Sequence, residues 1–125
     1  MATPTHKQIA VDFLKAAASG HVREAYERYI SPGFHHHNPY FPGDAASLMQ
    51  GMEENGKEFP NKSLEVHRVL EDGNDVAVFG HVKHTPEEHG FALVHIFRFE
   101  GDRIAELWDI GQEVPAESVN QYGMF

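Results

Sequence analysis

The spacing of apolar residues changes once along this chain, at Pro60, and that change limits the folds it can adopt. Before Pro60, apolar residues recur three and four positions apart, as they do on one face of a helix. We predict a first helix capped by Thr5 and ended by Ser19-Gly20, a second over 21–30, and a third that Asp44 caps and that ends before Pro60. Residues 34–43, rich in proline and aromatic side chains, are expected to form an ordered loop.

After Pro60, apolar and polar residues alternate, which is typical of strands with one buried face. The alternation predicts four antiparallel strands over residues 63–72, 75–85, 91–100 and 104–112. Three helices followed by such a meander predict an α+β fold, with the helices packed on one face of a curved sheet.

The chain has 125 residues, of which 41% are hydrophobic, so we expect one domain over 1–125. Its net charge of −9, with no basic cluster, argues against nucleic acid and anionic membranes as partners. Because it has no cysteine, thiolate chemistry is excluded. The start of the chain lacks the apolar segment of a signal peptide, so we expect a cytoplasmic protein.

Residues 91–110 predict a β-hairpin, because two alternating stretches flank turn residues at 100–103. A three-residue loop sets His95 opposite Asp109, whereas a two-residue loop would set the Glu106 carboxylate against Phe97. We therefore expect the longer loop. It also pairs like with like: Phe97 with Leu107, Phe99 with Ala105, Arg98 with Glu106, and Ile96 with Trp108.

His95 and Asp109 are the main candidates for catalysis. An imidazole and a carboxylate on one apolar face can share a proton, so each reduces the cost of burying the other. Their attraction is expected to lower the pKa of the aspartate, while burial opposes its charge. Such a pair can perform acid/base catalysis, but it can also be a structural ion pair, and the residues alone leave both open.

His37 and Asn38 are expected to reach the mouth of a cavity and orient substrate oxygens, with His37 as a third catalytic candidate. In an extended segment, residues 35 and 37 would point one way and residue 36 the other. Pairing of strands 75–85 and 91–100 across the loop between them is expected to set His81 opposite His95 and Phe79 opposite Phe97. The residues that we expect to contact a substrate are Phe34, Asn38, Tyr40, Met52, Phe79, His81, Leu93, Phe97 and Leu107.

The other face of the hairpin is also apolar, at Val94, Ile96, Trp108 and Ile110. A monomer would leave these side chains in water, and an exposed apolar patch of this kind usually marks an interface. We therefore predict a homodimer through this face, with Trp108 as a central anchor.

A metal site could be built from His37, His95, Asp109 and His81, because neutral imidazole and carboxylate suit zinc. However, the chain has no short ligand spacing such as H-E-x-x-H. Phosphate-loop, dinucleotide-binding and serine-nucleophile motifs are absent too. We therefore expect neither a metal nor a cofactor.

Several short motifs recur in one known group of proteins: Tyr29-Ile30, His37-Asn38-Pro39, Ile96-Phe97-Arg98, Arg103-Ile104, Glu106-Leu107-Trp108-Asp109, and a tail with Gln112, Val114-Pro115, Asn120 and Gly123-Met124-Phe125. Along most of its length the chain resembles the SnoaL-like polyketide cyclases and aldol-condensation proteins of the nuclear-transport-factor-2-like superfamily. The resemblance implies a cone-shaped, curved antiparallel sheet packed against three N-terminal helices. It also implies a pocket with a strand histidine and, 14 residues later, an acid/base aspartate, a spacing that His95 and Asp109 have.

These observations lead us to expect a cofactor-independent acid/base enzyme that acts on a small apolar carbonyl substrate by aldol condensation or cyclisation. Two alternatives stay open. One is a small-molecule binding protein of the same fold without catalysis, and the other is a metal-dependent enzyme that uses the clustered histidines.

Overall fold

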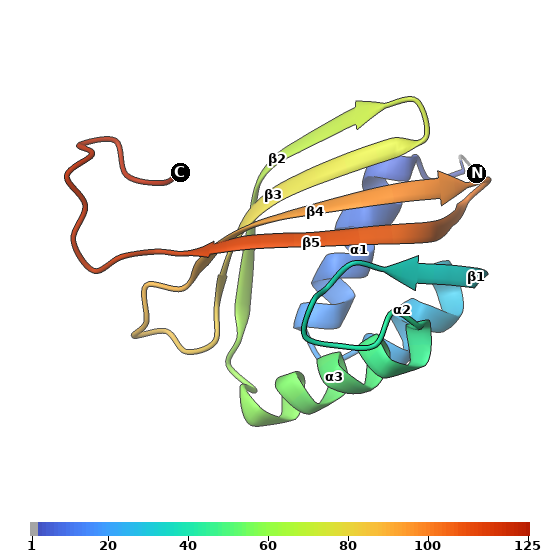
Figure 1. Cartoon of the computed structure of the whole chain (residues 1–125), viewed down its shortest axis with the longest axis horizontal. Coiled ribbons are helices and arrows are strands. Elements are labelled where there is room, and N and C mark those ends of the chain that lie inside the picture. The colour runs from blue at the N-terminus through green and yellow to red at the C-terminus, as the bar shows by residue number, and fades with distance from the viewer. Residues whose placement is uncertain (1–2) are drawn as a thin grey trace.

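The computed structural model describes residues 3–125, which form three helices and one five-stranded sheet (Figure 1). The strands lie in the order β1-β5-β4-β3-β2. The helices lie to one side of this curved sheet, which gives the predicted α+β cone (Figure 1). The elements are α1 (His6–Ala18), α2 (Val22–Tyr29), β1 (Ile30–His36), α3 (Ala45–Glu58), β2 (Ser63–Asp72), β3 (Asp75–Lys83), β4 (Phe91–Glu100) and β5 (Arg103–Glu113).

Two helices begin at the predicted caps. The Thr5 hydroxyl accepts a hydrogen bond from the N–H of Gln8, and the Gln8 side chain accepts one from the N–H of Thr5. At the start of α3, the Asp44 carboxylate accepts from the N–H of Ser47. These side chains satisfy N–H groups that the first turn of a helix leaves without a partner. The cap at Asp44 also ends the loop that borders the candidate site.

β1 forms where we expected the end of a helix and a loop. It pairs in parallel with β5, with His35 opposite Glu106, so the sheet is mixed and the prediction of a wholly antiparallel sheet is wrong. Pro32 is tolerated because β1 lies at the sheet edge and the proline falls between Ile30 and His35, where the pairing with β5 is interrupted. Pro32 and Gly33 also interrupt the alternation that would have revealed a strand, and the pairing shifts register between Ile30 and His35.

The β4–β5 hairpin has the predicted register at His95 and Asp109, but its turn differs. Phe99 pairs with Ile104 rather than Ala105, so the loop holds two residues, not three. A β-bulge next to this pair takes up one extra residue and restores the register for the rest of the hairpin. The prediction of a three-residue loop was wrong because it did not consider a bulge.

The register of β3 on β4 also differs from the prediction. Val78, and not His81, lies opposite His95, and Phe79 does not lie opposite Phe97. His81 and Phe79 consequently point to the face of the sheet away from His95. The observed register buries Val78 on the helix side, where only 1% of it is exposed, and the predicted one would have turned this valine outward.

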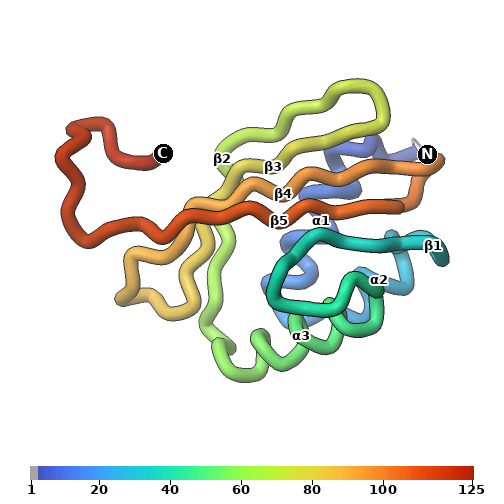
Figure 2. Tube along the Cα trace, in the orientation of Figure 1, coloured from blue at the N-terminus to red at the C-terminus, as the bar shows by residue number. Residues whose placement is uncertain are grey.

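The core lies between the concave face of the sheet and the helices, and its largest fully buried side chains include Phe13, Phe97, Phe99 and Leu107. Beyond β5, the chain leaves the sheet and turns back toward it (Figure 2). At its end, Phe125 stacks on His81 and Phe79 on the outer face, with ring centroids 4.3 and 5.6 Å apart. Within residues 3–125, no helix combines the length and the apolar character needed to cross a bilayer.

Candidate functional site

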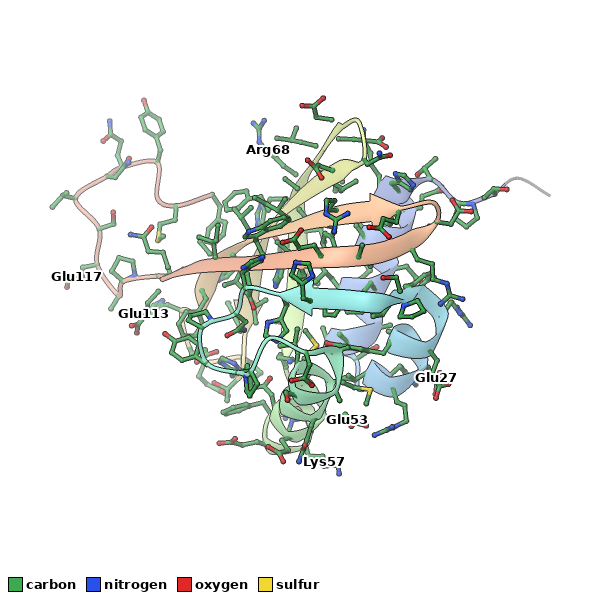
Figure 3. All side chains as sticks on the ribbon, turned by 45° about the vertical axis from the view of Figure 1, so that its right-hand side comes forward. Glu27, Glu53, Lys57, Arg68, Glu113 and Glu117 are labelled. Atoms are coloured by element: carbon green, nitrogen blue, oxygen red, sulfur yellow. The ribbon has the colours of Figure 1, made fainter. Side chains whose placement is uncertain are left out.

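A cavity of about 640 Å³ lies between the concave face of the sheet, α1, α3 and the loop after β1. Apolar side chains such as Leu14, Met52 and Leu93 form most of its walls. A few polar groups face the same space, among them Asn38, Lys62, His84, His95 and Asp109. An apolar cavity with a small number of convergent polar groups is the usual form of a small-molecule site. By contrast, the charged side chains of Glu27, Lys57 and Glu117 point outward (Figure 3).

His95 and Asp109 face each other across β4 and β5 in this cavity. Nε2 of His95 lies 3.4 Å from Oδ1 of Asp109, and the two side chains are 10% and 21% exposed. This separation is that of an ion-pair contact and is long for a hydrogen bond. The prediction that the two groups converge on an apolar face is confirmed, and their part in catalysis stays a prediction.

Asn38 holds the second oxygen of Asp109. Its side-chain Nδ2 donates to Oδ2 of Asp109 at 2.9 Å, and its Oδ1 accepts from the N–H of Tyr40 at 3.0 Å. Because one end of the amide must donate and the other must accept, these two bonds fix which way it points. Asn38 therefore donates one of its amide hydrogens to Asp109, so it positions the carboxylate as well as lining the cavity.

His36 orients Asn38 in turn. Nε2 of His36 lies 2.6 Å from the carbonyl oxygen of Pro42, so this nitrogen carries a hydrogen and donates it. Nδ1 of His36 then accepts from the N–H of Asn38 at 3.0 Å. Both ring nitrogens of this buried histidine are used by backbone groups of the loop after β1, which is how the fold brings Asn38 to Asp109.

The pKa of Asp109 reflects opposing effects. Burial raises it, but the contact with His95 and the amide of Asn38 outweigh burial and hold the pKa of this carboxyl below its usual value. Asp109 is therefore ionised at neutral pH, although it sits among apolar side chains.

The SnoaL-like domain family matches residues 10–107 of this sequence. The chain belongs to the SnoaL-like domain family. This SnoaL-like chain has no match among curated proteins.

Solved structures agree with the fold. A nuclear-transport-factor-2-like protein of unknown function from Cytophaga hutchinsonii is 20% identical, with a TM-score of 0.72 over 90% of this chain and 95% of that one. AclR, a candidate hydroxylase from Streptomyces galilaeus, is 21% identical, with a TM-score of 0.72 over 88% of this chain and 80% of that one. A candidate polyketide cyclase from Acidithiobacillus ferrooxidans is 18% identical, with a TM-score of 0.67 over 90% and 92%. At these identities the likeness establishes the fold alone.

His37 does not reach the cavity of this SnoaL-like domain. It follows β1 with its side chain on the outer face, where its Nε2 lies 2.6 Å from Oε2 of Glu106 and its ring stacks on Trp108. Residues alternate along an extended segment, so His36 turns inward while His35 and His37 turn outward. The alternation was predicted, but the placement of His37 at the cavity mouth was wrong.

The four-residue metal site that we considered from the sequence does not form. His95 and Asp109 lie in the cavity, whereas His37 and His81 lie on the outer face. His81 is occupied there by Phe125, which stacks on it, and by the carbonyl oxygen of His89 at 2.7 Å. The sheet itself thus separates the proposed ligands.

The other predicted contact residues divide into three groups. Asn38, Tyr40, Met52 and Leu93 line the cavity, with Tyr40 exposed at its mouth. Three others are part of the core beside the cavity and do not line it: Phe34, Phe97 and Leu107. Phe79 and His81 lie on the outer face, because the predicted β3 register was wrong.

Lys62 is a cavity residue that the sequence did not reveal. It precedes β2, and its Nζ donates to Oδ1 of Asn55 near the end of α3 at 2.6 Å. Burial lowers the pKa of this lysine. A single lysine beside a proline turn carries no local signal, and only the packing of α3 against the start of β2 places it in the cavity.

Proposed function

We propose that this SnoaL-like chain is a cofactor-independent acid/base enzyme that acts on a small, largely apolar carbonyl compound. One observation carries the proposal: Asp109, contacted by His95 at 3.4 Å and by the Asn38 amide at 2.9 Å, lies in an apolar cavity of about 640 Å³. An ionised carboxylate held in this way can accept a proton from a substrate carbon. The reaction class also agrees with the name of one structural neighbour, the candidate polyketide cyclase.

In the proposed reaction, Asp109 removes a proton from the carbon α to a carbonyl, and the C–H electron pair becomes that of an enolate. The enolate carbon attacks a second carbonyl carbon, which forms the new carbon–carbon bond and leaves an alkoxide. The alkoxide then takes a proton from the carboxylic acid of Asp109, either directly or by way of His95, which gives up one proton to the alkoxide and receives the proton of Asp109. Positioned proton transfer of this kind contributes about 10²- to 10⁴-fold in rate.

The lowered pKa of Asp109 keeps the base ionised but also makes it weak. A substrate that fills the cavity would displace water from the carboxylate, and this desolvation raises its proton affinity. Lys62 lines the same cavity, and in its protonated form it would stabilise the negative charge that develops on the enolate.

The first test compares Asp109→Asn with wild type on a panel of β-keto compounds, with carbon–carbon bond formation followed by mass spectrometry. Asp102→Asn is the matched control, because Asp102 is an exposed residue in the turn before β5. We expect turnover by wild type and by Asp102→Asn, and none by Asp109→Asn. Retained turnover in folded Asp109→Asn would remove the mechanism.

A second function is favoured by one observation. Both oxygens of Asp109 are already engaged and its pKa is lowered, as in a structural pair that shapes a binding site without chemistry. In that case, the protein would bind apolar carbonyl compounds in the same cavity and return them unchanged. Calorimetric binding of compounds for which no product forms would distinguish this function from the enzyme.

We also propose a homodimer through the outer face that carries Val94, Ile96, Trp108 and Ile110. Ile110 is 56% exposed, so this apolar side chain is available to a second copy. An apolar patch can complement itself across a two-fold axis without needing paired charges. Sedimentation should show a dimer for wild type and a monomer for Ile110→Asp. A monomeric wild type at micromolar concentration would contradict this assembly.

A further inference from the structure

The outer face carries a second cluster of chemically active side chains, formed by His35, His37 and Glu106, which we call the outer triad. His35 lies on β1 directly opposite Glu106 on β5. His37 follows two positions later, so its side chain points to the same face, and its N–H donates to the carbonyl of Leu107 at 2.9 Å. One ligand atom from each residue of the triad lies within 4.8 Å of the other two.

The two imidazoles converge on a single carboxylate oxygen. Nε2 of His35 and Nε2 of His37 lie 2.9 and 2.6 Å from Oε2 of Glu106. The other oxygen, Oε1, accepts a hydrogen bond from Nε of Arg98 at 3.0 Å. Arg98 therefore orients the carboxylate and leaves Oε2 as the atom that faces both histidines.

In the single chain, the outer triad is held in place on one side and open to solvent on the other. The ring of His37 stacks on Trp108 at 4.9 Å with planes 11° apart, which limits its rotation. Glu106 is only 14% exposed, whereas the side chains of His35 and His37 are 52% and 45% exposed. A cation bound here would have three protein ligands and a further position open to solvent.

We propose that the outer triad is a binding site for a divalent transition-metal ion, in the first place zinc. Two imidazole nitrogens and one carboxylate oxygen are a ligand set that suits zinc, cobalt and nickel, whereas magnesium and calcium prefer oxygen ligands. In a tetrahedral zinc site, neighbouring ligand atoms lie roughly 3.4 Å apart, given metal–ligand bonds of about 2.0–2.2 Å. The two nitrogen–oxygen separations would need to widen by about 0.5 and 0.8 Å, and the half-exposed side chain of His35, which is not part of the stack on Trp108, has room to move.

A metal ion in this site would link β1 to β5. β1 is an edge strand whose neighbour in the sheet is β5, and the outer triad joins the end of β1 to β5 on the face opposite the cavity. His37 immediately precedes Asn38, the residue that donates to Asp109. A metal in the outer triad would therefore restrain the loop that holds Asn38 against the carboxylate. The metal site itself is independent of the proposed enzymatic reaction.

Trp108 provides a built-in reporter, because it is the only tryptophan of the chain and it touches His37. The experiment uses the full chain, purified without nickel resin and treated with a chelator. Zn²⁺ is titrated by calorimetry, and Co²⁺ by quenching of Trp108 fluorescence, with Mg²⁺ as the negative control. We expect one zinc per chain, saturable cobalt quenching, a higher Tm with zinc, and no response to magnesium.

Three variants make this test specific. His35→Ala removes one ligand but keeps both rings of the His37–Trp108 stack, and it should weaken zinc and cobalt binding at least tenfold. Glu106→Gln keeps a carbonyl oxygen for Arg98 and should weaken binding similarly. His21→Ala is the matched control, an exposed histidine outside the outer triad, and should bind like wild type. Equal zinc affinity in His35→Ala and wild type, or cobalt binding without quenching of Trp108, would overturn the proposal.

Discussion

Asn38 and Asp109 are 71 positions apart in the chain, yet the Asn38 amide donates a hydrogen bond of 2.9 Å to Oδ2 of Asp109. The parallel pairing of β1 with β5 makes this contact possible, because it brings the loop after β1 alongside the strand that carries Asp109. Asn38 thereby sets both the direction of the carboxylate and, in part, its pKa.

Replacing Asn38 by alanine should lower kcat/KM of the proposed reaction by about 10- to 100-fold, the value of a hydrogen bond to a charged group. The same change removes a group that lowers the pKa of Asp109, so the acid limb of the pH–rate profile should move to higher pH. Steady-state kinetics across the acidic range measures both effects. Asn61→Ala, in the exposed turn before β2, is the control. An unshifted acid limb in Asn38→Ala would show that Asn38 does not act on Asp109.

Asp109 should also make folding stability depend on pH. Its folded-state pKa lies below its ordinary value of 3.8, so the ionised group stabilises the fold above the pKa of the unfolded chain. This contribution is lost as pH falls through the folded-state pKa. The free energy of unfolding of wild type, measured with urea, should therefore fall relative to that of Asp109→Asn between neutral pH and about pH 3. A difference that is constant over this range would contradict the pKa assignment.

Phe97 tests the distinction between core and cavity wall. Phe97→Ala should lower the free energy of unfolding by about 3–5 kcal/mol, because this side chain is fully buried in the core. Leu93 lines the cavity, so Leu93→Ala should cost less stability and should raise KM. Urea unfolding and steady-state kinetics on both variants provide the comparison. If Phe97→Ala were mildly destabilising and changed KM instead, Phe97 would belong to the cavity wall.

Substitution of Gly51 tests whether the position of Phe41 at the cavity matters for ligand binding. A Cβ at Gly51 would collide with the ring of Phe41, and both residues line the cavity. Gly51→Ala should therefore displace Phe41 and weaken ligand binding, even though alanine is more favourable than glycine within a helix by about 1 kcal/mol. Gly56 lies on the same helix, and a Cβ there meets no neighbour within 4 Å. Gly56→Ala should raise Tm without changing affinity, and equal affinities in the two variants would contradict a role for Phe41.

Elements that are determined by local spacing and alternation of residues could be predicted from the sequence. The capping box at Thr5, the helix start at Asp44 and the pairing of His95 with Asp109 all follow from local rules of spacing and alternation. The convergence of His95 and Asp109 could be predicted because the two strands of a hairpin are close in sequence. The alternation of side chains along them then decides which groups share a face.

The parts that sequence did not reveal depend on irregular or long-range pairing. A bulge between the Arg98 and Phe99 pairs changed the loop length, and Pro32 concealed β1. With β1 unrecognised, His36 was overlooked as the residue that orients Asn38, and His37 was assigned to the wrong face. The β3 register depended on where Val78 could be buried, which requires knowing the position of the helices.

The proposed function depends on Asp109 removing a proton from a carbon next to a carbonyl, and hydrogen–deuterium exchange isolates that step. A β-keto compound is incubated with the protein in deuterated buffer, without a second carbonyl partner, and loss of the α-proton signal is followed by NMR. We predict exchange well above the buffer rate for wild type and Asp102→Asn, and exchange at the buffer rate for Asp109→Asn. Exchange by Asp109→Asn as fast as by wild type, for a compound that binds in the cavity, would contradict the role of Asp109 as the base.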